Sequence, residues 1–416
     1  MDKFIVTGGK KLGGTISVSG AKNAILPIMT ATLLAKGKST LTNVPNLVDI
    51  QMMANLLRAL GAKVEFENDT ITIDSTRVNS HKAPYELVSK MRASIYVLGP
   101  LLAIFGKAKV SFPGGCAIGT RPVDLHLKAM ETFGTKIKIE NGYILANCKL
   151  LKGAEIFFEK VSVGATCNAL MTAVLANGTT TIYNAAKEPE IANLIDFLNK
   201  MGAKIEGQNS STLKIFGVKN LQPIAMKMMP DRIEAGTFLI AAATTNTQII
   251  VQNCSATHLQ ILINKLREVG CTIKINENSI ELMPPKIIKA VDIQTLPYPG
   301  FPTDLQAQFM ALMTLSNGTS IIEDTIFPDR FIHVAELNRL DANIKINKNI
   351  ATVTGVKKLS GAEIMASDLR ASAALVIAGL AAKGETTISR IYHIDRGYDK
   401  IEEKLQKIGA NITRVK

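Results

Sequence analysis

A short motif recurs six times along the chain, and this repeat limits the possible folds more than any other feature of the sequence. In each copy a helix-like amphipathic stretch ends at a small anchor, and an alternating, strand-like stretch follows. The second residues of the six anchors are Gly61, Gly134, Gly202, Gly270, Asp341 and Gly409. They lie 73, 68, 68, 71 and 68 residues apart, so the repeat is about 70 residues long. The chain is therefore expected to consist of six similar units.

Each anchor is interpreted as the end of a helix. Glycine adopts the left-handed backbone conformation that closes a helix without a steric penalty, and the aspartate at position 341 is one of the better-tolerated substitutes. A second series of turns lies upstream in each unit, and a helix is expected to begin 14 residues before each of these turns. The six predicted helix starts are Asn23, Arg92, Gly164, Arg232, Asp304 and Arg370.

The six helices are apolar on nearly every face, as residues 371–382 illustrate, and a helix without a polar face belongs in a core. The intervening strands alternate or carry polar residues, which predicts sheets with one solvent-exposed face. The expected fold is α/β, an inside-out α/β barrel in which outer sheets surround buried helices. Because 416 residues are too many for one core, we expect two lobes of three repeat units each, residues 20–229 and residues 1–19 plus 230–416. The strand-like segments 4–7 and 15–18 are expected to join the second lobe.

Composition excludes several classes of protein. The longest apolar runs have 11 and 12 residues, too few to cross a bilayer, and the first residues do not resemble a secretion signal, so we expect a cytoplasmic protein. The five cysteines are scattered without a Cys-x-x-Cys pair, which indicates neither a disulfide framework nor a metal site. The net charge of +13 comes mostly from dispersed lysines, since only 12 of the 48 basic residues are arginine. This distribution is typical of solvated surface.

Cations stand where several of the buried helices are expected to begin: Lys22, Arg92, Arg232 and Arg370. Helix N-termini attract anions, because their amide groups and the helix dipole are positive there. A cation at this end is therefore unfavourable unless an anion is bound. We expect the helix starts to converge on a cleft between the lobes that binds phosphate or carboxylate groups.

Three motifs are shared with a known family: Ser19–Ala24, the loop Phe112–His126, and Pro299–Gln308. The chain resembles the enolpyruvyl transferase family over its whole length, in particular the members that act on UDP-N-acetylglucosamine. The resemblance implies transfer of the enolpyruvyl group of phosphoenolpyruvate to the sugar 3-hydroxyl, with release of phosphate, as the first committed step of bacterial peptidoglycan synthesis. The expected partners are these two small-molecule substrates. No cofactor, metal, nucleic acid, membrane or obligatory protein partner is implied.

Cys116 is the cysteine expected to be reactive. Pro113, Gly114 and Gly115 place it in an exposed turn, and Arg121 favours its thiolate form. The other four cysteines lie in or beside apolar elements and are expected to pack in the cores. The resemblance makes Cys116 the acid that protonates C3 of phosphoenolpyruvate, with a thiol that is also able to form a covalent adduct with this substrate.

The resemblance also assigns the rest of the phosphoenolpyruvate site. Asp304 is expected to accept the proton of the sugar hydroxyl, although an aspartate at a helix start is also explained as a cap. Lys22, Arg121 and Arg396 are expected to hold the phosphate. Arg370 and Arg396 are expected to hold the carboxylate, and Arg92 to support this end of the site. The expected catalytic residues are Lys22, Cys116, Asp304 and Arg396.

The remaining expected ligands bind the nucleotide sugar. By resemblance, Asn23 contacts the sugar and Ile326 its acetamido group. The uracil and ribose are assigned to Arg121, Pro122, Val123, Asp124 and Leu125. The diphosphate is assigned to the third helix start, with Lys160, Ser162, Val163 and Gly164. The roles of four further residues stay open between binding and structure: His126, Glu188, Asp231 and Glu234.

Three other functions compete with this interpretation. Transfer to shikimate 3-phosphate is disfavoured by Cys116 and by the sequence Ala21-Lys22-Asn23, where enzymes of that type typically carry a serine. Nucleic-acid binding is disfavoured because tryptophan is absent and aromatic residues make up only 5% of the chain. A sugar-nucleotide sensor without activity is disfavoured because the expected catalytic residues are all present.

Overall fold

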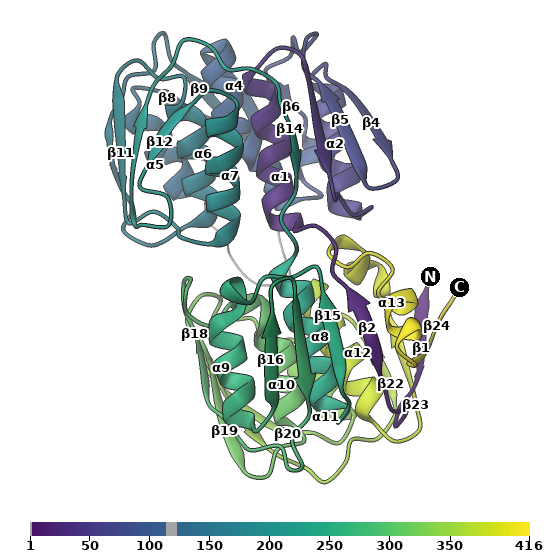
Figure 1. Ribbon diagram of the computed structural model, residues 1–416. Helices are drawn as coiled ribbons and strands as arrows, with labels where there is room; N and C mark the ends of the chain where they lie inside the picture. Colours follow the sequence, from purple (N-terminus) through teal and green to yellow (C-terminus); the bar gives the residue numbers. More distant parts are fainter. Residues whose placement is uncertain (1, 114–122) are drawn as a thin grey trace. The chain divides into compact units, whose positions relative to one another are not determined.

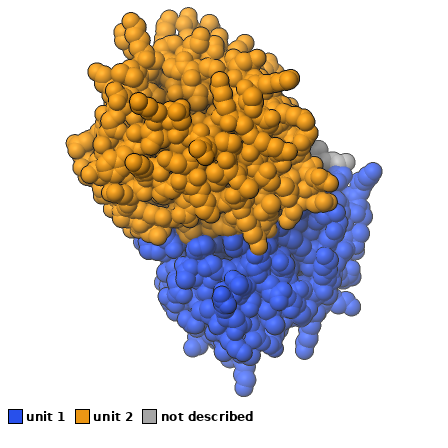
Figure 2. Space-filling model, turned by 45° about the horizontal axis from the view of Figure 1, so that its top comes forward, with its two compact units in different colours: residues 1–19, 117–119, 230–416 blue, residues 20–116, 120–229 orange. Residues whose placement is uncertain are grey.

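The computed structural model describes residues 2–113 and 123–416 and divides the chain into two compact units. Unit 1 comprises residues 2–19 and 230–416, and unit 2 comprises residues 20–113 and 123–229; Figure 2 colours them blue and orange. Three of the residues expected to act on substrate, Cys116, Arg121 and Pro122, lie outside the described residues.

The described residues form six four-stranded sheets. In each sheet a short edge strand pairs parallel to its neighbour and the other pairs are antiparallel. The sheets of unit 2 are, in spatial order, β14 (Ala225–Lys227), β3 (Lys38–Thr42), β5 (Thr70–Asp74), β4 (Lys63–Glu67); β6 (Lys82–Ala83), β7 (Lys107–Ser111), β9 (Tyr143–Asn147), β8 (Lys136–Glu140); and β10 (Glu155–Phe157), β11 (Thr179–Tyr183), β13 (Thr212–Phe216), β12 (Lys204–Glu206).

The sheets of unit 1 follow the same order, but the start of the chain supplies one strand to each of two of them. They are β2 (Gly14–Ser17), β15 (Ile249–Gln252), β17 (Ser279–Met283), β16 (Thr272–Asn276); β18 (Ile293–Thr295), β19 (Thr319–Asp324), β21 (Ile350–Thr354), β20 (Asn343–Asn347); and β22 (Glu363–Met365), β23 (Glu385–Ser389), β1 (Lys3–Thr7), β24 (Asn411–Val415). Strand β1 is antiparallel to both β23 and β24, and β2 is the parallel edge strand beside β15. The two N-terminal strands therefore pair with strands of unit 1.

Each unit encloses three apolar helices within its sheets (Figure 1). These helices are α1 (Lys22–Ala31), α4 (Leu98–Phe105), α6 (Val163–Ala173), α8 (Arg232–Thr244), α10 (Gln306–Met313) and α12 (Leu369–Ala381). A 3-10 turn follows α1, and others precede α4 and α10: η1 (Thr32–Leu34), η2 (Arg92–Val97) and η4 (Thr303–Leu305). With these opening turns included, all six predicted helix starts are confirmed to within one residue. At α4 the tighter opening turn fits Pro100, which has no amide hydrogen to donate to the preceding turn.

A second set of helices has one buried and one exposed face. They are α2 (Val48–Ala59), α5 (Asp124–Thr132), α7 (Pro189–Lys200), α9 (Gln260–Val269), α11 (His333–Arg339) and α13 (Ile401–Lys407), with the short helices α3 (Tyr85–Val88), η3 (Ala256–Leu259) and η5 (Ile391–Arg396) between other elements. The six predicted anchors follow these helices, and all have a left-handed backbone, with φ of 103°, 89°, 105°, 109°, 67° and 96° in chain order. Asp341, the fifth, adopts this conformation like the glycines. The helix ends are thus where the repeat predicts them.

Each unit has its own hydrophobic core, in which the enclosed helices meet the inner faces of the sheets. Along strands such as β13 the side chains alternate between exposed and buried, so one face of the sheet is wet. All 13 residues of α8 are buried. The predicted α/β fold with buried helices and outer sheets is confirmed. Among the described residues, every helix is too short or too polar to cross a membrane.

Candidate active site

In unit 2, Lys22 opens the enclosed helix α1 with a buried ammonium group. Its Nζ lies 3.1 Å from Oδ2 of Asp49, which stands in the first turn of α2 and is itself buried. The ion pair fixes the cation at the helix start, where Ala21 provides no side-chain cap, and the next residue, Asn23, is partly exposed. Asp49 is a partner of Lys22 that the repeat analysis does not identify, although an acidic residue in a first helical turn is a recognisable signal.

The start of α6 carries the residues expected to bind a diphosphate. Ser162 caps this helix by accepting a hydrogen bond from the amide of Ala165 at 3.2 Å. Lys160 is exposed just before it, and Val163 and Gly164 are partly exposed. Gly164 packs closely against the ring of His126, since a Cβ at this position would lie 3.0 Å from Cε1 and Nε2 of the histidine. The absence of a side chain at Gly164 therefore brings the imidazole up to the helix start.

The orientation of His126 follows from the hydrogen bonds of Asn168. Asn168 Oδ1 accepts from the amide of Gly99 at 3.0 Å, so its nitrogen is the donor, to the Ile95 carbonyl at 3.0 Å and to His126 Nδ1 at 2.8 Å. Nδ1 is thus an acceptor and the ring proton is on Nε2, beside Gly164. Burial, together with the smaller effect of the charge of Arg92, lowers the pKa of His126 to about 3. The histidine is a neutral hydrogen-bond donor at physiological pH.

Arg92 and three predicted uracil ligands are also placed in unit 2. Arg92 opens η2 and is partly exposed. Val123 is buried, whereas Asp124 and Leu125 form the exposed and half-buried start of α5. The structure therefore brings Arg92, His126 and the start of α6 together in one region.

In unit 1, Asp304 lies between two buried arginines. Its Oδ1 is 2.9 Å from Nη1 of Arg330, and its Oδ2 is 2.8 Å from Nη2 of Arg370. The arginine side chains are 5% and 4% exposed, whereas that of Asp304 is 26% exposed. Asp304 is thus the solvent-facing member of a nearly buried cluster with two positive charges and one negative charge.

Burial alone would raise the pKa of Asp304, but the positive charges of Arg370 and Arg330 and their hydrogen bonds hold it well below its ordinary value. Burial would likewise lower the pKa of Arg370, yet the charge of Asp304 holds it above the ordinary value. Asp304 is therefore a carboxylate and a weak base in this arrangement. A stronger base requires that one of the two cations be drawn away.

Arg330 belongs to the site, although the sequence analysis does not single it out. Its Nη1 also donates to Thr303 Oγ1 at 3.0 Å, and that hydroxyl donates to Asp324 Oδ2 at 2.7 Å. The other oxygen of the fully buried Asp324 accepts from the amide of Ile326 at 3.0 Å, which fixes the loop carrying the predicted acetamido ligand. The partner of Asp304 is 26 residues away in sequence, so no local pattern reveals it.

Arg396 ends η5 and is partly exposed. Its positive charge contributes to lowering the pKa of His393, after the larger effect of burial. The predicted unit 1 residues Asp304 and Arg370 are in direct contact. Ile326 follows β19 and Arg396 ends η5, in other parts of the same unit.

Besides His126, two of the residues with open roles have structural contacts in unit 1. Asp231 caps α8 by accepting from the amides of Ile233 and Glu234, at 2.8 and 3.1 Å. Glu234 is buried, with Oε1 2.6 Å from Lys404 Nζ and Oε2 accepting from the amide of Ser19 at 2.7 Å. Burial raises the pKa of Glu234, and Lys404 opposes this shift. These contacts tie the end of β2 to α8 and α13.

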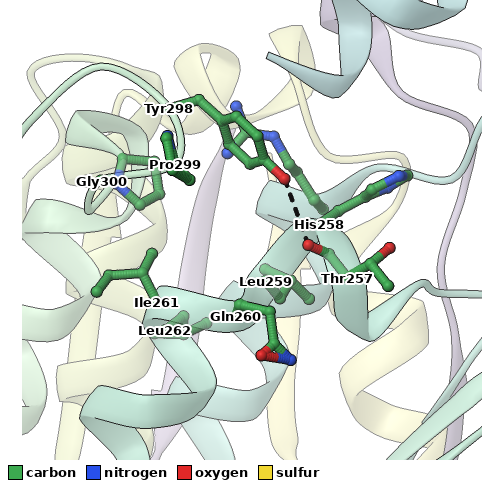
Figure 3. Close-up of a pocket in the computed structure, with 11 residues that line it drawn as sticks. Thr257, His258, Leu259, Gln260, Ile261, Leu262, Tyr298, Pro299 and Gly300 are labelled. Carbon is green, nitrogen blue, oxygen red and sulfur yellow. Dashed lines mark hydrogen bonds between the residues drawn. The ribbon is translucent and has the colours of Figure 1, made fainter. Parts of the chain in front are cut away.

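A small cavity in unit 1 lies beside the loop that carries Pro299 and Gly300 (Figure 3). Arg232 and Tyr298 border it, with the guanidinium 5.7 Å from the ring centroid, and the Tyr298 hydroxyl donates to the Thr257 carbonyl at 3.3 Å. Its volume of about 20 Å³ admits little more than a water molecule. The expected substrates are far larger than this space.

The remaining cysteines among the described residues are as expected for core positions, with one partial exception. Cys167, Cys254 and Cys271 are buried, and Cys148 is half-buried. Burial raises the pKa of Cys254 to about 11 and that of Cys271 to about 12, and it raises that of Cys167 as well. These thiols are protonated and unreactive at neutral pH. Within the described residues, no group of three or more potential metal ligands occurs.

Comparison with known proteins places this architecture in a class. The enolpyruvyl transferase NikO from Streptomyces tendae superimposes with a TM-score of 0.91 over 100% of this chain and 99% of its own, at 23% sequence identity. The fold is therefore that of the enolpyruvyl transferases. The family model described as EPSP synthase (3-phosphoshikimate 1-carboxyvinyltransferase) matches residues 6–405.

Sequence identity with known proteins then identifies the family within this class. The UDP-N-acetylglucosamine 1-carboxyvinyltransferase of Desulfosudis oleivorans is 54% identical over 415 residues, covering 100% of both chains. The corresponding protein of Chloroherpeton thalassium is 55% identical over 417 residues, covering 100% of this chain and 97% of its own. The chain belongs to the UDP-N-acetylglucosamine 1-carboxyvinyltransferase family.

Proposed function

We propose that the protein transfers the enolpyruvyl group of phosphoenolpyruvate to the 3-hydroxyl of UDP-N-acetylglucosamine and releases inorganic phosphate, the first committed step of peptidoglycan synthesis. The observation that carries this proposal is the identity of 54% over the full length of a 1-carboxyvinyltransferase for this acceptor. The presence of Asp304, Lys22, Arg370 and Cys116 in the chain agrees with it. We place the reaction in the cytoplasm, as for the family.

Asp304 is the proposed acceptor of the hydroxyl proton. In the reaction the sugar oxygen attacks C2 of phosphoenolpyruvate and C3 takes a proton, which gives a tetrahedral adduct. The adduct then loses a proton from C3 and expels the phosphate, so that the double bond between C2 and C3 is restored. Asp304 is suited to the first proton transfer because its carboxylate is ionised and 26% exposed. Arg370 is the proposed ligand of the substrate carboxylate, since a guanidinium binds such a planar anion through two parallel hydrogen bonds.

Lys22 is the proposed phosphate ligand of unit 2. Its buried ammonium group is held at a helix start by Asp49, at 3.1 Å, so a second anion meets a cation that is already fixed in place. Arg396, and Arg121 from outside the described residues, are the proposed additional cations for the phosphate. Asn23 and Ile326 are proposed to contact the sugar and its acetamido group, and Arg92 to support the phosphoenolpyruvate end of the site.

The uridine diphosphate part of UDP-N-acetylglucosamine is proposed to bind at the starts of α5 and α6. Ser162 uses its side chain as a cap, so amide groups of the first turn of α6, including that of Gly164, are presented to an anion such as a diphosphate. Lys160 supplies an exposed positive charge beside them. Val123, Asp124 and Leu125, with Pro122 from outside the described residues, are the proposed contacts of the uracil and ribose.

Cys116 is the proposed acid for C3, a role that rests on its sequence context. We expect Cys116→Ser and Asp304→Ala each to lower the rate of turnover at least about 100-fold, as for the loss of a general acid or base. Cys271→Ser is the matched control, because Cys271 is a buried thiol between α9 and β16 of unit 1. Full activity of either site variant would remove that residue from the mechanism.

The decisive experiment supplies one acceptor at a time. Phosphate release from phosphoenolpyruvate is measured with UDP-N-acetylglucosamine and, separately, with shikimate 3-phosphate, the acceptor named in the matching family model. We expect turnover only with the sugar nucleotide and a product heavier than it by one enolpyruvyl group in mass spectrometry. Turnover with shikimate 3-phosphate alone would overturn the proposal.

A further inference from the structure

Tyr398 places a buried hydroxyl against Nη1 of Arg370, whereas Asp304 binds Nη2 of the same guanidinium. Its side chain is 1% exposed, and its hydroxyl oxygen lies 3.2 Å from Arg370 Nη1, 3.2 Å from Gln308 Nε2 and 2.8 Å from Thr237 Oγ1. The centre of the Arg370 guanidinium lies 5.6 Å from the ring centroid. The contacts of Asp304 described above leave this hydroxyl without a role.

The hydrogen bonds fix the direction of the Tyr398 hydroxyl. Thr237 donates its single hydroxyl proton to the Ile233 carbonyl at 2.8 Å, so it must accept from Tyr398. The Tyr398 oxygen is then the acceptor for both Arg370 and Gln308. Burial raises the pKa of Tyr398 and outweighs the opposing charge of Arg370, so the phenol stays neutral. Arg370 therefore meets a fixed, uncharged acceptor on this side.

The two ends of the Arg370 guanidinium thus have partners of different kinds. Nη1 is bound to the neutral phenol of Tyr398, which is fully buried, and Nη2 is bound to the carboxylate of Asp304, which faces solvent. In the proposed function Arg370 binds the substrate carboxylate and Asp304 accepts a proton. In this structure, however, the two side chains bind each other. Arg330 has a second anchor in Thr303, so it keeps its place when Asp304 shifts.

We propose that Tyr398 is a positioning residue: it holds Arg370 by Nη1 so that the carboxylate of phosphoenolpyruvate replaces Asp304 as the partner of Nη2. The inference rests on the proposed function, because it assumes that Arg370 binds the substrate carboxylate. Substrate binding then removes one of the two cations from Asp304 and makes it a stronger base only when the substrate is present. Without the phenol hydroxyl, Arg370 stays paired with Asp304, and its guanidinium is less often in the position that binds the substrate carboxylate.

Tyr398→Phe tests this inference because it keeps the ring and removes only the acceptor. Initial rates of phosphate release are measured with phosphoenolpyruvate varied and then with UDP-N-acetylglucosamine varied. We expect the KM for phosphoenolpyruvate to rise about tenfold, the size for loss of one hydrogen bond to a charged group, and the KM for the sugar nucleotide to stay within about twofold. Inhibition by inorganic phosphate, which lacks the carboxylate, should also change less than about twofold.

Tyr183→Phe is the matched control, since its hydroxyl lies on the surface of unit 2 and bonds Glu155 at 3.4 Å; its kinetic constants should equal those of the unmodified protein. Thr237→Val provides a second variant of nearly equal volume if Tyr398→Phe does not fold. By removing the acceptor that orients the phenol, it should raise the KM for phosphoenolpyruvate about threefold.

A purely structural role for Tyr398 would lower kcat through loss of folded enzyme and leave both KM values unchanged, which would overturn the inference. Equal changes in both KM values, or a parallel change in phosphate inhibition, would also overturn it, because the effect would then not be confined to the carboxylate. Failure of the proposed function looks different: the unmodified protein would release no phosphate with UDP-N-acetylglucosamine.

Discussion

The cluster formed by Asp304, Arg330 and Arg370 makes protein stability sensitive to a single carboxylate. In Asp304→Asn the shape is kept, but the two arginines, 5% and 4% exposed, lose their shared counter-charge. Removing one partner from a buried ion pair typically costs about 3–5 kcal/mol. Because the Asp304 side chain is 26% exposed and water screens part of the repulsion, we expect a loss of about 2 kcal/mol.

Thermal unfolding measures this loss. For a unit of about 200 residues, 1 kcal/mol corresponds to roughly 2–4 °C, so Asp304→Asn should lower the unfolding temperature of unit 1 by about 4–8 °C. Added inorganic phosphate should recover more of the unfolding temperature in the variant than in the unmodified protein, because an anion restores the missing charge. Asp329→Asn, an exposed acid in the neighbouring loop, is the control and should change the stability by less than about 0.5 kcal/mol.

The reasoning would be refuted if Asp304→Asn unfolded at or above the temperature of the unmodified protein. That result would mean that the two arginines are hydrated or separated enough to tolerate each other without the carboxylate. It would also remove the physical basis for a depressed Asp304 pKa, and with it the requirement that substrate binding strengthen the base.

Three further predictions concern other parts of the molecule. Gly164→Ala places a Cβ 3.0 Å from two ring atoms of His126, so the KM for UDP-N-acetylglucosamine should rise at least about threefold in steady-state assays while that for phosphoenolpyruvate stays constant. The pKa of His126 is about 3 in the folded chain, against 6.5 normally. As the pH falls, the histidine is therefore protonated first in the unfolded chain, which stabilises the unfolded state. The free energy of unfolding should drop by about 2 kcal/mol between pH 6.5 and 5, and by less in His126→Asn. Gly99→Ala places a Cβ 2.7 Å from the Asn168 carbonyl oxygen and should destabilise unit 2 by about 1–3 kcal/mol in thermal unfolding, whereas Gly13→Ala, with no atom within 4 Å of the added Cβ, should have little effect.

The parts of the fold that depend on local sequence could be predicted from it. The helix starts and the left-handed anchors are set by apolar periodicity and by residues such as Gly61 that tolerate positive φ. Asp341 fits the same rule despite its side chain, because the spacing of the repeat marks the position independently of residue type. The same patterns predict which helices are buried in the cores and which faces of the sheets are exposed to solvent.

The contacts within the candidate site could not be predicted in this way. Arg330 and Tyr398 are 26 and 28 residues from the residues they bind, and Thr237 is 161 residues from Tyr398. Such partners are chosen by how distant segments pack, and an arginine or tyrosine in a loop carries no periodic signal. The pairing of Asp304 with Arg370 is a similar case: the sequence suggests that both act on substrate, but not that they bind each other.

The pairing of β1 with both β23 and β24 also sets the order in which the chain is able to fold during synthesis. All described residues of unit 2 lie between residues 20 and 229, so they have all been made when residue 229 leaves the ribosome. Strand β1 must wait for Val415, about 400 residues after Lys3, which is roughly 20–80 s at usual translation rates. Strand β2 meets its partner sooner, once β15 has been made, but β1 has no partner until β23 and β24 follow. Until then β1 is an exposed, unpaired strand ahead of unit 2, and this is the stage at which a chaperone has most to protect.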